Sequence, residues 1–201
     1  MTIRSNHYDA AFEEYLRSRR AAYVAVDETR RALAGDDSLK SLDFIVNAAA
    51  PAAAHEQGGV ANLLVDVKGR RFGGAAGRWE NWITRDDVES MQRWEAAFGP
   101  HFRATLVFAY ALDDTLAARL QPLTAGDAPP LIAGPLPDEL CDYSLFPHDG
   151  RRYVFAAAYL DEYAAQLRPR SPRWHTLSVP RADFRALQFP FDRLLPPHDD
   201  E

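Results

Sequence analysis

The chain has 201 residues, of which 47% are hydrophobic, and a formal net charge of −6. This composition is sufficient for one compact core, and the acidic balance argues against a protein that coats nucleic acid through a general cationic field. The single cysteine, Cys141, excludes an intramolecular disulfide framework and a multi-cysteine zinc site, and it favours a reducing, cytoplasmic compartment. The N-terminal segment contains no apolar signal core, and no later run approaches the ~18 apolar residues of a membrane span, so no membrane partner is expected.

Helical and strand patterns alternate from the N-terminus to Leu112. Tyr8, Phe12 and Tyr15 lie on one apolar stripe at helical spacing, which predicts the first helix. In order, the expected elements are a helix over 8–21, strands over 21–28, 41–46 and 62–68, a helix over 84–98 and a strand over 102–112. The second helix begins with Thr84 and Asp87 in a variant of the capping box. This αβββαβ order predicts an α/β layer arrangement.

The remaining segments are connections and an extension. A low-complexity hairpin connection is expected over 47–61, and a glycine-rich loop over 69–82. Residues 1–112 form the expected core, and residues 113–149 a proline-rich connection. Residues 150–201 are expected to form an α+β extension that packs on the core within one structural domain.

Two opposite charges interrupt the apolar strand over 62–68. Asp66 and Lys68 are two positions apart, so both side chains point to one side of the sheet. If the preceding strand pairs with this one, Asp43 lies beside Asp66, and two close carboxylates favour a hard cation such as Mg²⁺. A lysine there would orient or help to deprotonate a water, or offset charge on a phosphate. The alternative interpretation is a structural or surface ion pair.

Two helices carry further polar candidates. Glu13 and Glu14 lie at opposite edges of the first helix's apolar stripe, so periodicity does not decide which of them faces the sheet. Gln92 falls on the same face of the second helix as Val88 and Met91, where a polar amide either reaches a site or is a boundary residue with its own partners.

A basic cluster follows the candidate pair. Lys68, Arg70, Arg71 and Arg78 form the only local concentration of positive charge in this part of the chain, in the expected loop. Next to a metal site, Arg70, Arg71 and Arg78 would contact the phosphates of DNA. The alternative is an arginine-rich loop that is merely solvated.

The segment NHYDAAFEEYL, residues 6–16, resembles the His-Tyr-Glu-x-Ala-Phe-Glu signature of the bacterial HYExAFE family, with Asp9 in place of the glutamate. The segments SLKSLDFIV, NLLVDVKGR and ENWITRDDVESMQRWEAAFG also resemble that family's core. The resemblance extends over residues 6–112, and more loosely to RPRSPRWHTLSVP near the C-terminus.

The same stretches resemble the PD-(D/E)xK nuclease superfamily, in particular the archaeal-type Holliday junction resolvases. The resemblance implies a restriction-endonuclease-like αβββαβ core with a mixed central sheet flanked by helices. By position, Glu13 matches the helix acid, Asp43 the second-strand aspartate, and Asp66 with Lys68 the Asp/Glu-x-Lys pair. Gln92 matches a helical glutamine of related nucleases. Proline commonly precedes the second-strand aspartate in that superfamily, whereas the residue before Asp43 in this chain is not a proline.

The residues and the resemblance together predict a divalent-metal-dependent endonuclease that hydrolyses DNA phosphodiester bonds. Glu13, Asp43 and Asp66 would hold Mg²⁺, for which Mn²⁺ would substitute. Lys68 would position or activate the attacking water, and Gln92 would support the substrate or the water. Branched or otherwise structured DNA is the substrate that the resemblance to junction resolvases implies.

Two other classes of function remain open. The acidic net charge and a C-terminal half without a motif of its own are consistent with a catalytically inactive nuclease-fold protein that acts as a binding or scaffold module. Phe72, Trp79 and Trp82, if exposed, would form a protein–protein surface. A homodimer is expected by analogy, because relatives that cleave junctions act on a two-fold symmetric substrate.

Overall fold

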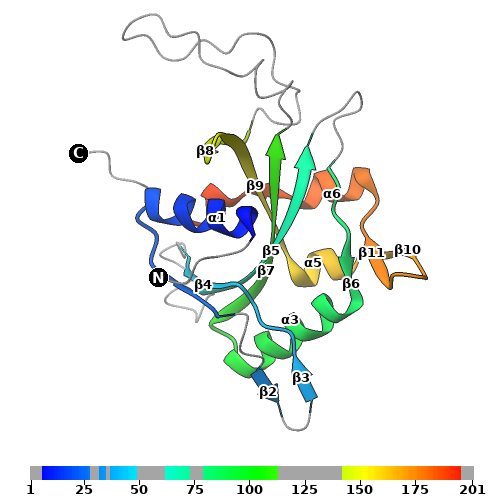
Figure 1. Cartoon of the computed structure of the whole chain (residues 1–201). Helices are drawn as coiled ribbons and strands as arrows, with labels where there is room; N and C mark the ends of the chain where they lie inside the picture. The colour runs from blue at the N-terminus through cyan, green and yellow to red at the C-terminus, as the bar shows by residue number, and fades with distance from the viewer. Residues whose placement is uncertain are drawn as a thin grey trace, which may run out of the picture.

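The computed structural model describes residues 6–27, 32–34, 37–48, 62–72, 79–112 and 142–195, without the side chains of 32–34, 37 and 38. The described residues form a mixed seven-stranded sheet in the order β1-β4-β5-β7-β9-β12, with β8 also paired to β9 (Figure 1). Its strands are β1 (Tyr23–Ala25), β4 (Phe44–Asn47), β5 (Asn62–Phe72), β7 (Phe102–Leu112), β8 (Phe146–His148), β9 (Arg151–Tyr159) and β12 (Phe189–Pro190).

The centre of the sheet consists of three long strands. β5 and β7 pair in parallel along their full lengths, and β9 pairs antiparallel with the other edge of β7. β4 is antiparallel to β5 on the opposite side. Almost every residue of β7 is buried, as is usual for a strand that is covered on both faces.

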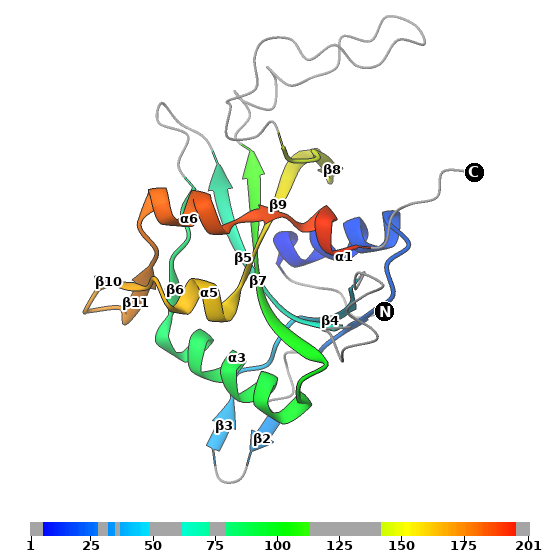
Figure 2. The ribbon, with the colours of Figure 1, turned by 180° about the vertical axis from the view of Figure 1, so that it is seen from behind.

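Helices cover both faces of the sheet (Figures 1 and 2). On one face α1 (His7–Ser18) and the 3₁₀ helix η2 (Phe191–Leu194) pack on Val65 and Val107. On the other face α3 (Arg85–Phe98), α5 (Leu160–Ala164) and α6 (Arg181–Leu187) pack on Leu64 and Leu106. Alternate residues of each strand thus enter two separate hydrophobic cores.

Two small sheets lie beside the main one. β2 (Ala32–Ala34) and β3 (Asp37–Leu39) form an antiparallel pair. β10 (Arg168–Ser171) and β11 (Thr176–Ser178) form a hairpin whose second strand pairs with β6 (Ile83–Thr84), directly before α3. This pairing ties the C-terminal part of the chain to the start of α3.

The helices and strands predicted for the chain up to Leu112 are all present in the predicted order, and the mixed α/β architecture is confirmed. The short strands β2, β3 and β6 were not predicted. The capping box of α3 is present, since Thr84 and Asp87 bond to each other's backbone amides. Several bounds differ from those expected. The helix α1 ends at Ser18 rather than at residue 21, and β1 is shorter than the strand expected over 21–28. β5 continues to Phe72, so the expected loop begins later than residue 69. Of the connections expected over 47–61 and 113–149, residues 49–61 and 113–141 lie outside the described residues. β8 lies within the second connection, so the C-terminal strands begin before residue 150.

The hypothesis that Phe72, Trp79 and Trp82 form a protein–protein surface is wrong, because none of these side chains is exposed. Phe72 and Trp79 are buried in the core that α3, α5 and α6 cover, where each ring contacts Tyr110. Trp82 is half-buried beneath the guanidinium group of Arg70. Among the described helices, none has both the length and the apolar character needed to cross a lipid bilayer.

Candidate functional site

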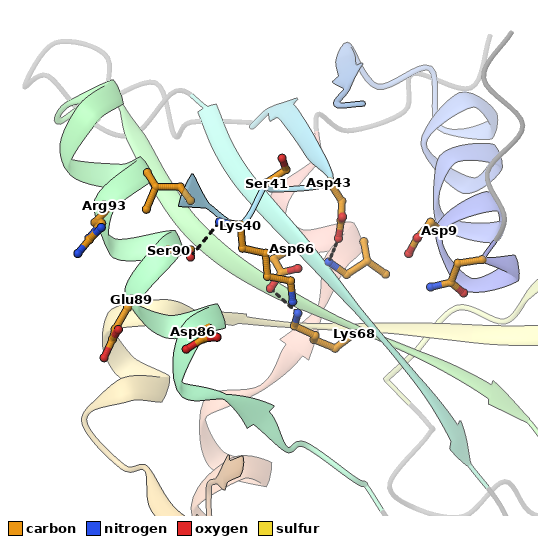
Figure 3. Close-up of a pocket in the computed structure, with 13 residues that line it drawn as sticks. Asp9, Lys40, Ser41, Asp43, Asp66, Lys68, Asp86, Glu89, Ser90 and Arg93 are labelled. Atoms are coloured by element: carbon orange, nitrogen blue, oxygen red, sulfur yellow. Dashed lines mark hydrogen bonds and ion pairs between the residues drawn. The ribbon is translucent and has the colours of Figure 1, made fainter. Parts of the chain in front are cut away.

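A cavity of about 760 Å³ lies between α1 and α3, beside β4 and β5 (Figure 3). Its lining is mostly polar and comes from four parts of the fold: the start of α1, the segment from β3 to β4, the middle of β5 and the exposed side of α3. The lining residues are Asn6, Asp9, Leu39, Lys40, Ser41, Asp43, Asp66, Val67, Lys68, Asp86, Glu89, Ser90 and Arg93.

Asp43 directly precedes β4 and lies beside the part of β5 that contains Asp66. Its amide donates to the carbonyl of Val65 (2.9 Å), and its Oδ2 accepts from the amide of Val67 (2.5 Å). Asp43 and Asp66 are 6% and 4% exposed, and both border the cavity. The pairing expected for these two consecutive strands is therefore present, and it brings both carboxylates to one cavity.

Lys68 is held between two carboxylates. Its Nζ lies 2.7 Å from Oδ2 of Asp66 and 3.0 Å from Oδ1 of Asp87, and its side chain is 11% exposed. Burial by itself would lower the pKa of Lys68, but the attraction of Asp66 and Asp87 outweighs it and raises the pKa above its ordinary value. Lys68 is therefore an ammonium group at neutral pH, suited to offsetting negative charge rather than to accepting a proton.

Asp87 connects this pair to α3 and to Lys40. Its Oδ1 forms an ion pair with Lys40, and its Oδ2 accepts from the amide of Thr84 (2.7 Å). Burial opposes ionisation of Asp87, but Lys68, Lys40 and the Thr84 amide together hold its pKa below its ordinary value. The capping box that starts α3 thus also supports the cavity's charged network, which consists of Asp66, Lys68, Asp87 and Lys40.

The helix acid at the cavity is Asp9, and the assignment of Glu13 to this position is corrected. Oε1 of Glu13 accepts from Arg17 (2.7 Å) and from the hydroxyl of Tyr23 (3.1 Å), and Glu13 does not line the cavity. Asp9 lies one turn earlier, is 5% exposed and borders the cavity. Asp9 is buried on α1 together with Phe12 and Leu16, whereas Glu13, one turn further on, is only partly buried and bonds outside the cavity.

Gln92, Arg70 and Arg71 do not line the cavity. Gln92 is exposed on α3 and is not part of the lining. Arg70 is in β5 rather than in a loop, is 8% exposed, and stacks 3.9 Å from the ring centre of Trp82. Its guanidinium also donates to the carbonyls of Gly69 (2.7 Å) and Trp82. Arg71 is exposed, and Arg78 lies outside the described residues.

The sequence analysis did not identify several residues that line the cavity, although their spacing in the sequence pointed to them. Asp86, Glu89, Ser90 and Arg93 have the i, i+3, i+4, i+7 spacing of one helical face. A polar stripe of this kind is usually solvent-exposed, and only the position of α3 beside β5 makes it a cavity wall. The acid of the first motif, Asp9, was likewise visible in the sequence.

Carboxylates that line the cavity are of the ligand type that Mg²⁺ prefers. Among the residues that the structure describes, no three histidine, cysteine or acidic side chains converge closely enough to hold a metal ion by themselves. Mg²⁺ is commonly bound by one or two carboxylates, with waters and substrate phosphates completing its octahedral coordination. Asp43 and Asp66, with Asp9 on the facing wall, fit that pattern of hard oxygen donors.

Comparison of the chain with protein-family models, with curated proteins and with solved structures finds no match.

Proposed function

We propose that the protein is a divalent-metal-dependent nuclease that hydrolyses DNA phosphodiester bonds on a restriction-endonuclease-like αβββαβ core. The observation that carries this proposal is the meeting of Asp43, Asp66 and Lys68 at one open cavity, with Asp43 directly before the second strand of the predicted order and Asp66 and Lys68 on the third. If Asp66 and Lys68 formed a purely structural ion pair, they would require neither Asp43 beside them nor a cavity in front of them.

Each residue has a definite role in this proposal. Asp43 and Asp66 would hold Mg²⁺ or Mn²⁺, and Asp9 takes the place first given to Glu13. When bound, the cation neutralises charge on the phosphate and makes a coordinated water more acidic. Lys68 remains protonated, orients Asp66 through their ion pair and offsets negative charge that develops on the phosphate. Branched DNA as the substrate and a homodimer as the active form remain predictions.

The direct test is cleavage of plasmid, single-stranded and four-way-junction DNA in Mg²⁺. We expect Lys68→Ala and Asp66→Asn each to reduce the rate by about a hundredfold or more, as for loss of a preorganised charged group at a reacting phosphate. Because Lys68 is buried, thermal unfolding of each variant and a length-preserving Lys68→Met variant separate loss of chemistry from loss of the fold. Equal cleavage by the wild type and a folded Lys68→Ala variant would contradict the proposal.

The two acids of α1 supply a matched control. Asp9→Asn removes a carboxylate from the cavity wall, whereas Glu13→Gln removes one that bonds to Arg17 and Tyr23 outside it. We expect cleavage to fall in the first variant and to stay close to wild type in the second. The opposite result would restore Glu13 as the helix acid and overturn the assignment of Asp9.

A binding or scaffold module is the second candidate, and one observation favours it. Lys68 is engaged by two carboxylates at once, which is also what a purely structural ion network requires. Titration with Mg²⁺ and Mn²⁺ separates the two candidates, since a ligand that binds the folded state raises the melting temperature. A rise that is lost in Asp43→Asn supports the nuclease, and an unchanged melting temperature supports the module.

A further inference from the structure

The hairpin of β10 and β11 carries a concentration of exposed basic side chains outside the cavity. Residues 168–178 read RPRSPRWHTLS and contain three arginines and a histidine without a single acid, in a chain of net charge −6. Arg168, Arg170, Arg173 and His175 are all exposed. The hairpin projects from the side of the molecule next to β6 (Figures 1 and 2).

An unusually exposed tryptophan lies at the tip of this hairpin. Trp174 is 65% exposed, the highest value among the large hydrophobic side chains of the described residues. The guanidinium carbon of Arg173 lies 4.9 Å from its ring centre, so the indole is bordered by positive charge. An exposed indole among cations contributes nothing to the core, which indicates a role in binding.

The hairpin is attached firmly to the wall of the cavity. Thr176 and Leu177 of β11 pair with β6, and the carbonyl of His175 accepts from the amide of Arg85 (3.2 Å). Arg85 is the first residue of α3, and the next residue, Asp86, lines the cavity. Backbone hydrogen bonds therefore hold β11, the strand that follows the tip, against the start of α3, which forms part of the cavity wall.

A second contact fixes the base of the hairpin. The register between β10 and β11 shifts around Arg170, as in a β-bulge, and bulges re-aim side chains. Arg170 faces Glu80 (3.8 Å) and Trp82, whose ring centre is 5.7 Å from its guanidinium carbon. Arg70 of β5 lies against the same tryptophan. This leaves Arg168 and Arg173 as the arginines of the hairpin that face outward, with His175 beside them.

We infer that this hairpin binds an unpaired stretch of nucleic acid, with Trp174 stacking on a base and the flanking arginines contacting phosphates. Sequence-tolerant binding of single strands combines these two features. In a duplex the base faces are covered by their neighbours, so a single indole finds a free face only where bases are unpaired. The inference rests on the proposed function and deepens it, because it names an unpaired strand as the part of the substrate that enters the cavity beside α3.

An anionic membrane surface is a poorer fit to the same residues. Membrane-binding elements bury an apolar face made of several side chains. Within the described residues, the exposed large hydrophobic side chains are Val24, Phe98 and Trp174, which lie on three different elements. One indole between arginines matches a stacked base better than it matches a lipid interface.

The test measures binding separately from cleavage. Fluorescence anisotropy in EDTA gives the affinity of the full chain for labelled oligothymidine, for oligouridine and for a DNA duplex of equal length. We expect Trp174→Ala to weaken oligothymidine binding by about tenfold, Trp174→Phe to retain most of it, and duplex binding to change little. The oligouridine arm distinguishes DNA from RNA as the source of the unpaired bases. Arg168→Ala and Arg173→Ala should each lower the slope of log affinity against log salt by about 0.7.

Matched controls remove an aromatic or an arginine elsewhere. Phe98→Ala takes away the exposed ring at the end of α3, and Arg193→Ala takes away an exposed arginine of η2. Both should bind like the wild type. Equal oligothymidine affinity of the wild type and Trp174→Ala, or binding of the wild type to anionic phospholipid vesicles but to neither oligonucleotide, would overturn the inference.

The experiments give different results if the proposal for the hairpin is wrong and if the proposal of nuclease activity is wrong. If Trp174→Ala loses oligothymidine binding in EDTA while the wild type cleaves nothing in Mg²⁺, the hairpin is supported and the nuclease is not. If the wild type cleaves single-stranded DNA while Trp174→Ala binds and cleaves it equally well, the nuclease is supported and the hairpin is overturned.

Discussion

Asp87 is the residue on which the charged network of the cavity depends. It is buried, bonds to the start of α3 through Thr84, and lies within ion-pair distance of both Lys68 and Lys40. Its pKa in the folded state is below its ordinary value of 3.8, although burial alone would raise it. Ionised Asp87 therefore stabilises the fold fully above about pH 4, and the stabilisation is lost as the pH falls, because the unfolded chain takes up the proton first.

The corresponding prediction concerns stability as a function of pH. Asp87→Asn should lower the free energy of unfolding at neutral pH by about 3 kcal/mol, because it leaves the buried Lys68 with one carboxylate instead of two. The difference from the wild type should shrink as the pH falls below about 4. Urea unfolding followed by tryptophan fluorescence measures both. Asp86→Asn, at the exposed neighbouring position, should follow the wild-type curve, and parallel curves for Asp87→Asn and wild type would contradict the prediction.

At the scale of elements, the position of α1 depends on a close approach to β5. A Cβ added to Gly69 would overlap the aromatic ring of Tyr8, so only glycine lets the start of the helix lie this near the strand. Tyr8 also packs edge-on against Tyr153, and its neighbour His7 bonds to the hydroxyl of Tyr153 (2.9 Å). Asp9 directly follows, so the same contact places the helix acid at the cavity.

Gly69→Ala should consequently push α1 away from the sheet. We expect a loss of about 1–3 kcal/mol in the free energy of unfolding, the usual range for overpacking. The same substitution in a Tyr8→Ala background should cost less, because the overlapping ring is gone, and this non-additivity identifies the contact. Thermal unfolding of the two single variants and the double variant gives the coupling. Strictly additive effects would show that Gly69 and Tyr8 do not constrain each other.

At the scale of the whole molecule, the C-terminal part of the chain completes the sheet. β9 pairs with β7 from Thr105 to Ala111, and its residues enter both hydrophobic cores. Without β9, the apolar strand β7 would become an exposed edge, which is prone to aggregation. We therefore expect the αβββαβ order that ends at Leu112 to fold only together with β9, rather than as an independent unit.

A truncation experiment tests this dependence. A chain ending at Leu112 should show no cooperative thermal transition by circular dichroism, because both cores would lose one side of their packing. A chain ending at Leu195 should keep the transition, since it retains Phe191 and Leu194 of η2. A cooperative transition in the shorter chain would mean that the segment up to Leu112 folds alone.

Local patterns were sufficient to predict most of the core elements. The capping pair Thr84 and Asp87 and the apolar run of β7 depend on neighbours in the sequence, so their helix and strand were predicted close to the observed bounds. The pairing of Asp43 with the strand of Asp66 was also predictable, because consecutive strands usually pair. The end of β5 was placed too early, since arginines and a glycine are typical of loops, whereas Arg70 is accommodated in the strand by Trp82.

Contacts between residues that are distant in the sequence decided the features of the site that local patterns did not predict. Which acid of α1 faces the cavity depends on how the helix lies against Gly69, far from Tyr8 in the sequence. Lys68 can bond to both Asp66 and Asp87 only because α3 packs beside β5. Periodicity within either element contains no information about the distance between the two elements.

An acid–lysine pair on a buried strand was evident from the amino-acid order alone. Its place in a larger charged network, at the edge of a cavity and beside a basic hairpin from the C-terminal part of the chain, follows from packing. The physical reason is that electrostatic interactions act through space and not along the chain, so the neighbours of a charge are decided only when the elements pack.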